Sequence, residues 1–175
     1  MRLISSQKGF TLVELLVVIS IIGFLATSSI VTLDNARKKA RDTRRLADIS
    51  QIRKALEVYY QDNNQYPPNT DSDYGGWDVG FYGANDTFIS SLSTAKIMKN
   101  VPGDPLFNLQ ASGYRYHRYA AGYSNCDVNK GDFYVIGIVD METGGYPYPG
   151  SPGWRCPDRN WQLEFDWVTG GFVMN

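Results

Sequence analysis

A length of 175 residues and an aromatic content of 14% allow one modest hydrophobic core, and part of the 43% hydrophobic content lies in a single block near the start. These numbers exclude several globular domains and leave room for one compact extramembrane domain. The net charge of −1 is the sum over segments of the chain that differ in charge. Residues 1–9 carry two basic residues, residues 34–57 carry eight Lys/Arg against four Asp/Glu, and residues 58–175 carry seven against thirteen.

The first predicted element is an apolar helix over residues 10–33. Its 24 residues carry a single charge, Glu14. As a helix they would reach about 36 Å, which is enough for a hydrocarbon layer of about 30 Å. The sequence therefore predicts that the chain is held in a membrane at some stage, with one carboxylate near the start of the span.

Residues 34–62 continue this helix with an amphipathic pattern. Leu46, Ile49, Leu56 and Tyr60 recur at helical intervals, and charged residues occupy the remaining positions. Many charges have a partner four residues away, namely Asp34 with Lys38, Lys38 with Asp42, Arg44 with Asp48, and Arg53 with Glu57. We therefore expect a solvated helical face rather than a nucleic-acid patch, and one helix from about residue 10 to about residue 62.

Residues 63–175 read as a loop-rich head, because Gly, Pro, Asn, Asp and aromatic residues replace the helical pattern after "DNNQYPPN". Strand composition is found at 113–120 and 132–139, and residues 161–168 alternate Trp161, Leu163, Phe165 and Trp167 with mainly polar positions. A short helix is expected near 88–100. Three or four antiparallel strands with one face on the long helix would bury these aromatic side chains.

Two cysteines, Cys126 and Cys156, lie thirty positions apart in the head. In an exported head, a disulfide between them would remove chain entropy worth roughly 3 to 4 kcal/mol from the unfolded state. In a cytosolic head they would be two unrelated thiols. The positive-inside rule favours the cytosol, because two Lys/Arg precede the apolar run and six lie within residues 37–45. The cysteine pair, the low Lys content of the head and the character of the N-terminus favour export.

The N-terminus itself admits two general interpretations. A secretory signal peptide would use the basic start and the small residues at 26–28, but its apolar region is shorter and a central glutamate would cost about 2.5 to 3.5 kcal/mol on insertion. A plain membrane anchor carrying a surface-binding domain would leave Glu14 without a role.

A third interpretation rests on "KGFTLVELLVVISIIGFLA" (8–26), which resembles the class III signal of type IV prepilins and type II secretion pseudopilins. "ADISQIRKALEVYYQDNNQYP" (47–67) is similar to the end of the long helix in these proteins. The motif-level similarity covers about residues 8–67. It implies an α+β, type IV pilin-like fold: a long N-terminal helix, with a transmembrane half and an amphipathic half, packed on a small antiparallel β-sheet head.

The resemblance also implies how the chain would be processed and assembled. A prepilin peptidase would cut between Gly9 and Phe10 and methylate the new amino terminus of Phe10. Glu14, the fifth residue of the mature chain, would then neutralise this amine on an adjacent subunit, or within its own chain, since the two lie one helical turn apart. The expected segments are a leader at 1–9, a transmembrane and filament-core helix at 10–33, an amphipathic continuation at 34–62, and a head with a disulfide loop at 63–175.

The sequence departs from the family pattern in two features, the helix-breaking proline and the calcium-binding loop. The apolar segment has Gly23 but no proline, so local unwinding is less assured. Major pseudopilins typically bind calcium in the head, yet neither Asp127, Asn129 and Asp132 nor Asp71, Asp73 and Asp78 follow a calcium-loop order. We expect turn-forming residues there and no cofactor, with calcium in the head as the alternative.

Candidates for catalysis are few. His117 is the only histidine, so zinc sites with several histidine ligands and most Ser-His or Cys-His catalytic arrangements are excluded. We expect His117 to have a packing or surface role. There is no phosphate-binding glycine loop, so the energy for assembly would come from a separate ATPase with an inner-membrane platform. "NDT" (85–87) fits a glycosylation acceptor weakly. "GGYPYPGSPGW" (144–154) would cover the disulfide loop or bind a surface.

The sequence thus predicts a non-enzymatic pilin that is inserted in the inner membrane with its head outside and polymerises into a type IV pilus or pilus-like surface filament. The alternatives are the major pseudopilin of a type II secretion system and a membrane-anchored surface-binding domain that does not polymerise. The basic residues at 37–45 would pair with acidic heads of neighbouring subunits. Contact with DNA is the less favoured possibility.

Overall fold

The computed structural model describes residues 9–70, 75–80, 87–106 and 113–173, without the side chains at 28–31. Three of the features discussed above lie outside the described residues: residues 1–8 of the predicted leader, the carboxylates Asp71 and Asp73, and the acceptor Asn85. The chain divides into two compact units, residues 1–38 and residues 39–175, and each is described by itself.

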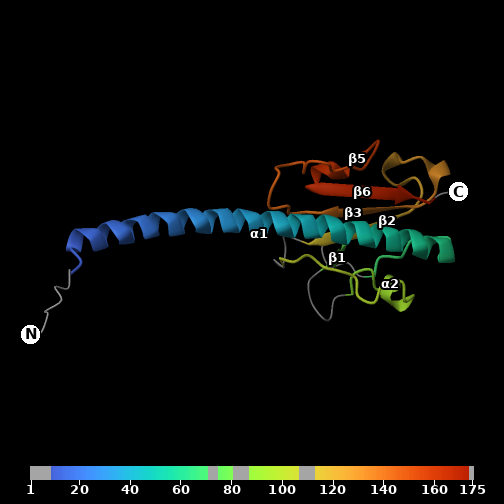
Figure 1. Ribbon diagram of the computed structural model, residues 1–175. Coiled ribbons are helices and arrows are strands. Elements are labelled where there is room, and N and C mark those ends of the chain that lie inside the picture. Colours follow the sequence, from blue (N-terminus) through green and yellow to red (C-terminus); the bar gives the residue numbers. More distant parts are fainter. Residues whose placement is uncertain (1–8, 71–74, 81–86, 107–112, 174–175) are drawn as a thin grey trace, which may run out of the picture. The chain divides into compact units, whose positions relative to one another are not determined.

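Helix α1 spans Leu12–Asn63, which confirms the prediction of one helix over this stretch (Figure 1). No proline interrupts it, and its end is set by local geometry. Asn64 has a left-handed φ of 53°, its N–H donates to the carbonyl of Tyr60, and Pro67 and Pro68 follow.

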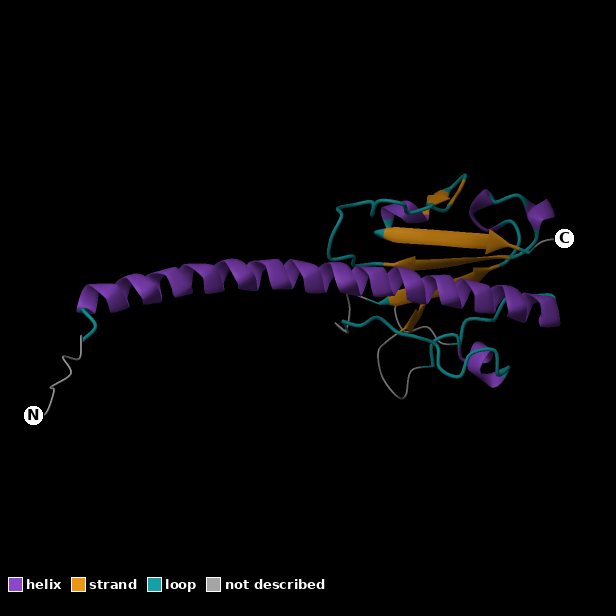
Figure 2. Cartoon of the chain, viewed as in Figure 1, coloured by secondary structure: helices purple, strands orange, loops and turns teal. Residues whose placement is uncertain are grey.

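The second unit contains a four-stranded antiparallel sheet in the order β1-β2-β3-β6 (Figure 2). Its strands are β1 (Asp78–Gly80), β2 (Tyr114–Tyr119), β3 (Phe133–Ile138) and β6 (Trp167–Phe172). A small hairpin joins β4 (Arg155–Cys156) to β5 (Arg159–Asn160), and α2 (Ser90–Thr94) is a short helix. The α+β, pilin-like fold class, the strands near 113–120 and 132–139, and the short helix near 88–100 are thus confirmed.

Both faces of the sheet are covered: one packs on α1, as the sequence predicted, and the other packs in a second core. Strand β3 is buried at every position, and its side chains alternate between two cores. Tyr134 and Ile136 face a core with Ile49 and Ile52 of α1, whereas Phe133 points to the opposite side.

The second core is closed by a segment that we call the cap, residues 123–130 and 154–165. Cys126, Cys156 and Trp161 of the cap pack in this core with Phe133 of β3. The ring of Phe165 lies directly against Gly137 of β3, where an added Cβ would lie 2.5 Å from a ring carbon. Glycine therefore lets the cap lie directly on the sheet.

The prediction of a strand over 161–168 is wrong. A 3₁₀ turn occupies Trp161–Leu163, and β6 begins only at Trp167. Polar side chains explain the bend: Asn160 accepts a hydrogen bond from the backbone N–H of Gln162, and the Gln162 amide donates to the carbonyls of Phe165 and Asp166. Leu163 is 73% exposed, and Trp161 and Trp167 enter different cores.

Candidate assembly site

The apolar part of α1 in the first unit is exposed along its described length. Phe10 is 89% exposed, and residues 9–27 and 32–37 are all classed as exposed. Among the described residues, α1 is the one helix that is long and apolar enough to cross a membrane. An apolar surface of this size is unstable in water, so it requires lipid or other apolar helices around it.

Hydroxyl groups inside the apolar part are satisfied by the helix itself. Ser20 donates to the carbonyl of Leu16 at 2.7 Å, and Thr27 donates to the carbonyl of Phe24 at 2.9 Å. These bonds leave no free hydroxyl donor at either position, which suits a segment without water.

Glu14 closes a capping box at the start of α1. Thr11 precedes the first helical residue, and its backbone N–H and hydroxyl both donate to Oε2 of Glu14, at 2.9 and 2.8 Å. The backbone N–H of Glu14 in turn donates to the Thr11 hydroxyl at 3.3 Å. The Thr-x-x-Glu spacing is a sequence signal for this motif, so the cap could have been predicted from it.

Gly9 and Phe10 lie immediately before this capping box, outside the helix, and both are exposed. Among the described atoms, none lies within 4 Å of a Cβ placed on Gly9. The peptide between them is therefore open in the described part of the chain, as the predicted cleavage position requires. With its Thr11 bonds, the Glu14 carboxylate lies one turn from the residue that would carry the new amine.

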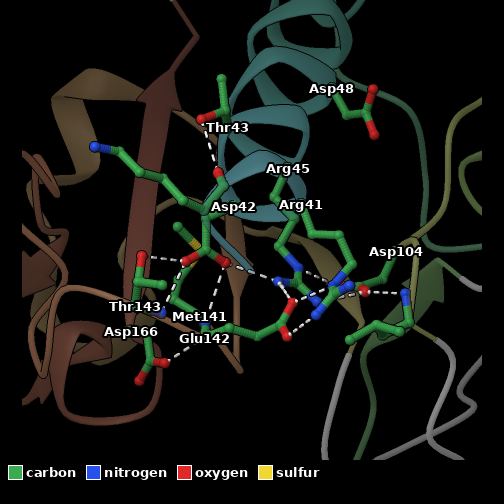
Figure 3. A network of polar contacts seen from close by, with 12 residues as sticks. Arg41, Asp42, Thr43, Arg45, Asp48, Asp104, Met141, Glu142, Thr143 and Asp166 are labelled. Carbon is green, nitrogen blue, oxygen red and sulfur yellow. Dashed lines mark hydrogen bonds and ion pairs between the residues drawn. The ribbon is translucent and has the colours of Figure 1, made fainter. Parts of the chain in front are cut away.

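In the second unit, a buried ion network fixes α1 to the head (Figure 3). The guanidinium of Arg45 donates twice to Asp104, at 2.9 and 3.0 Å, and once each to Asp42 and Glu142, at 2.8 Å. Arg41 forms a two-bond pair with Glu142 at 2.7 and 2.5 Å. The network therefore joins Arg45 to two carboxylates that are 59 and 97 positions away in the sequence.

Asp42 completes the network by holding the loop after β3. Its carboxylate accepts from the backbone N–H of Glu142 at 3.0 Å, and from the backbone N–H and hydroxyl of Thr143 at 2.8 and 2.6 Å. Asp42 is fully buried and Arg45 is 1% exposed. Asp42 and Arg45 each have more than one hydrogen-bond partner, and these bonds compensate for the removal of both charges from water.

Two expectations about the charged helix are corrected here. Asp42 and Arg45 do not belong to a solvated face, because their partners in the head bury them. Arg41 and Arg45 pair with Asp104 and Glu142 of the same chain rather than with a neighbour's head. The expected pairs of Asp34 with Lys38 and of Arg44 with Asp48 are present, at 3.1 and 3.7 Å.

The pKa shifts at this junction have opposite signs. Hydrogen bonds from Arg41, with further help from Arg45, hold the pKa of Glu142 below its usual range. Burial raises the pKa of Asp48, although its hydrogen bond from the Tyr114 hydroxyl, at 2.9 Å, opposes this shift. Glu142 is therefore stabilised as an anion, whereas burial makes Asp48 easier to protonate than a carboxylate in water.

The cap is fastened by the predicted disulfide. Cys126 and Cys156 are bonded, with their Cα atoms 4.9 Å apart. Arg159 stabilises the cap further. It donates to both carboxylate oxygens of Glu164, at 2.8 and 2.7 Å, and its guanidinium lies 4.9 Å from the ring centroid of Trp161.

His117 has the packing role that the sequence predicted. Its ring stacks on Tyr119, with centroids 4.1 Å apart, and meets Trp77 edge-on at 5.7 Å. Burial lowers the pKa of His117, and the nearby charge of Arg159 acts in the same direction. The neutral imidazole is therefore the form that fits beneath the cap.

The aromatic loop at 144–154 packs on both sides of the sheet, with Tyr148 against the core that contains Ile49 and Ile52 and Trp154 against the core beneath the cap. Trp154 packs on Phe172 of β6 with centroids 5.1 Å apart, and the Tyr146 hydroxyl donates to the carbonyl of Gln162. The loop was considered as a cover for the disulfide loop or as a surface-binding element, and these contacts support the covering role.

The carboxylates considered for calcium make local contacts. Asp127 accepts from the backbone and side chain of Asn129, Asp132 accepts from Ala121, and Asp78 accepts from Ile89. Within the described ranges, no three His, Cys, Asp or Glu side chains group as metal ligands would. These carboxylates thus have hydrogen-bonding roles in turns and between strands.

Comparisons with known proteins match the N-terminal segment. A family model described as the prokaryotic N-terminal methylation motif matches residues 4–30, which include Gly9, Phe10 and Glu14. No solved structure matches the chain.

Two kinds of relatives are similar to this chain. Type II secretion system core protein G of Escherichia coli is 42% identical over 67 residues, covering 38% of this chain and 46% of that protein. The type IV wide pilus major component PilA4 of Thermus thermophilus is 50% identical over 64 residues, covering 37% and 49%. The chain thus spans about half the length of the curated relatives it matches. These matches confirm the resemblance to type IV prepilins and type II secretion pseudopilins.

Proposed function

We propose that this chain is a structural subunit, a pilin, that polymerises through the apolar half of α1 into a type IV pilus or a pilus-like surface filament. The proposal rests on an exposed apolar helix that has an open Gly9–Phe10 peptide just before it and a carboxylate, Glu14, in its first turn. Relatives named as a pilus component and as a secretion-system core protein support it. The role requires no catalysis by the chain itself.

In this proposal a prepilin peptidase removes residues 1–9 and methylates Phe10. The subunit first spans the inner membrane through residues 10–33, with the head outside. A separate ATPase and membrane platform then drive its addition to the filament. Each new amine at Phe10 would be buried among apolar helices, where an unpaired cation is costly, and the carboxylate of Glu14 supplies the counter-charge.

The second candidate is the major pseudopilin of a type II secretion system, which the relatives named core protein G favour. Mass spectrometry of the mature N-terminus tests what both candidates share, because both predict a chain that starts at an N-methylated Phe10. An uncut chain, or one cut near residue 28, would contradict them and favour the anchored domain or the signal peptide. Electron microscopy of intact cells separates the two, since only the pilus predicts surface filaments.

A further inference from the structure

Three successive cations follow the apolar part of α1, at Arg37, Lys38 and Lys39. They lie beyond Leu33, the last residue of the predicted membrane span, by about 6 to 9 Å along an α-helix. The headgroup layer on each side of the hydrocarbon is about 5 to 8 Å thick, and long side chains on a helix lean toward its N-terminus, here the apolar part. We propose that Arg37 and Lys39 bind the headgroups of anionic phospholipids while the subunit spans the membrane.

The charges of Arg37 and Lys39 are available to a ligand. Both residues are exposed, and within the part of the chain that the structure describes neither side chain takes part in an ion pair or a hydrogen bond. Lys38 differs, because its ammonium group lies 3.1 Å from the carboxylate of Asp34. Asp34 is the one acidic residue in the sequence between 33 and 40, so the stretch keeps the two positive charges of Arg37 and Lys39.

The arrangement of the two cations favours a ligand that surrounds the helix. Successive residues of an α-helix are about 100° apart, so Arg37 and Lys39 lie about 200° apart, on nearly opposite sides. A protein docked on one side of the helix would contact one of them, whereas a headgroup layer encloses the helix and contacts both. This layer is also continuous with the lipid that the exposed apolar residues before it require.

A lipid ligand also gives a role to cations that conflict with the positive-inside rule. With the head outside, Arg37 and Lys39 would lie at the outer surface of the inner membrane, where this rule disfavours them. Anionic headgroups there would supply the opposite charge and hold the span at one depth. The inference rests on the membrane-spanning stage of the proposed function, and it does not depend on polymerisation.

Quenching of a tryptophan placed at the end of the span tests the contact. The full chain with Leu33→Trp is reconstituted in vesicles of phosphatidylcholine and phosphatidylglycerol, in which one lipid at a time carries brominated acyl chains that quench the indole on contact. Leu33 is exposed, and the four native tryptophans all lie in the head, so the unaltered chain gives the background. We expect a preference for phosphatidylglycerol of about threefold or more, which high salt should reduce.

Neutralisation of the two cations should remove this preference. In the Leu33→Trp chain, Arg37→Gln with Lys39→Gln should lower it to less than about 1.5-fold, because both headgroup contacts lose their charge. Lys96→Gln with Lys99→Gln is the matched control, since it removes the same charge from exposed positions in the head. The control should keep the original preference.

Three results would overturn the proposed contact and leave the proposed function intact. The first is equal quenching by the two lipids in the Leu33→Trp chain. The second is a preference that survives Arg37→Gln with Lys39→Gln, or that the control loses as well. The third is a loss of filaments in this double variant with an unchanged lipid preference, which would assign the cations to a neighbouring subunit. Failure of the unaltered chain to float with vesicles would instead overturn the membrane-spanning stage of the proposed function, and this contact with it.

Discussion

The carboxylate of Glu14 caps α1, and in the proposed filament it would also supply the counter-charge for the amine of Phe10. The two roles can be separated by substitution. Glu14→Gln keeps an acceptor for the Thr11 bonds but removes the charge, and Glu14→Ala removes both. We expect both variants to be cleaved and methylated at Phe10 and to form at least tenfold fewer filaments, because the buried amine lacks an anion. Filaments are counted by microscopy, and methylation is measured by mass spectrometry.

Thr11→Val is the matched control for this prediction, because it removes the hydroxyl of the capping box and keeps the charge of Glu14. It should destabilise the start of the helix by about 1 kcal/mol and leave filament number close to that of the unaltered chain. Normal filaments from Glu14→Gln would show that capping, and not charge, is what assembly requires.

Arg45 is the residue on which the junction between helix and head depends most. Arg45→Ala leaves Asp42 and Asp104 buried without their cation, so we expect a loss of about 3–5 kcal/mol in the free energy of unfolding. Chemical denaturation of the detergent-solubilised chain, followed by tryptophan fluorescence, measures this loss.

Arg44→Ala is the control on the neighbouring position. The Arg44 side chain is 53% exposed and 3.7 Å from Asp48, so its removal should cost less than about 1 kcal/mol. Equal losses for Arg44→Ala and Arg45→Ala would contradict the importance given to the buried network.

At the scale of elements, the sheet divides the head into a helix-side core and a cap-side core, and the disulfide lies in the cap-side core. Cys126→Ser with Cys156→Ser should lower the free energy of unfolding by roughly 3 to 4 kcal/mol, because the unfolded chain regains a loop of about thirty residues. Hydrogen exchange should rise first at residues 123–130 and 154–165, which the disulfide fastens, and last at β3, which lies between the cores. A uniform rise over α1 and the cap would contradict this division.

Periodic segments were predictable from the sequence, because their side-chain spacing is a local property. The apolar and amphipathic patterns predicted α1 closely, and β2 and β3 followed from runs of aromatic and β-branched residues. The 161–168 segment had an equally clear alternation, yet Asn160 and Gln162 hydrogen-bond to the local backbone and bend the chain. Strand β6 instead includes Gly170 and Gly171, which pair with β3 beyond the region that the pattern indicated.

The candidate site was predictable to different degrees in the two units. Gly9, Phe10 and Glu14 form a contiguous motif, so the sequence could assign them by resemblance. The ion network was not predictable, because Asp104 and Glu142 lie 59 and 97 positions from Arg45 and only the fold brings them to it. Nearest-neighbour spacing suggested that Asp42 would be a solvated partner of Lys38, whereas it is a buried acceptor for the loop after β3.

At the scale of the whole molecule, the charged pairs differ in how far they are shielded from water. Arg41 and Arg45 pair with carboxylates of the head within the chain, which makes the packed half of α1 part of the head. The exposed Arg44 pairs with Asp48 of the same helix at 3.7 Å. Screening by salt acts mainly on exposed pairs, so high ionic strength should weaken the pair of Arg44 with Asp48 before it affects the buried network.

The response of the head to pH follows from His117 and Glu142. The pKa of His117 is lowered by burial, so its contribution to stability is complete above its ordinary value of about 6.5 and is lost as the pH falls below that value. The pKa of Glu142 is lowered by Arg41 and Arg45, so its contribution is present above about 4.5 and is lost as the pH falls through the folded-state pKa. Asp48 and Asp166, whose pKa values are raised by burial, oppose the loss at acid pH, because the folded state binds their protons more readily.

We therefore expect the free energy of unfolding to fall in two steps as the pH decreases, the first beginning at about pH 6.5 and the second at about pH 4.5, with a slope of at most about 1.4 kcal/mol per pH unit for each proton. Denaturant titrations at a series of pH values measure both steps. His117→Gln should flatten the first step and leave the second, because it removes the only histidine. Glu142→Gln should do the reverse. An unchanged first step in His117→Gln would show that protonation beneath the cap does not limit the stability of the head.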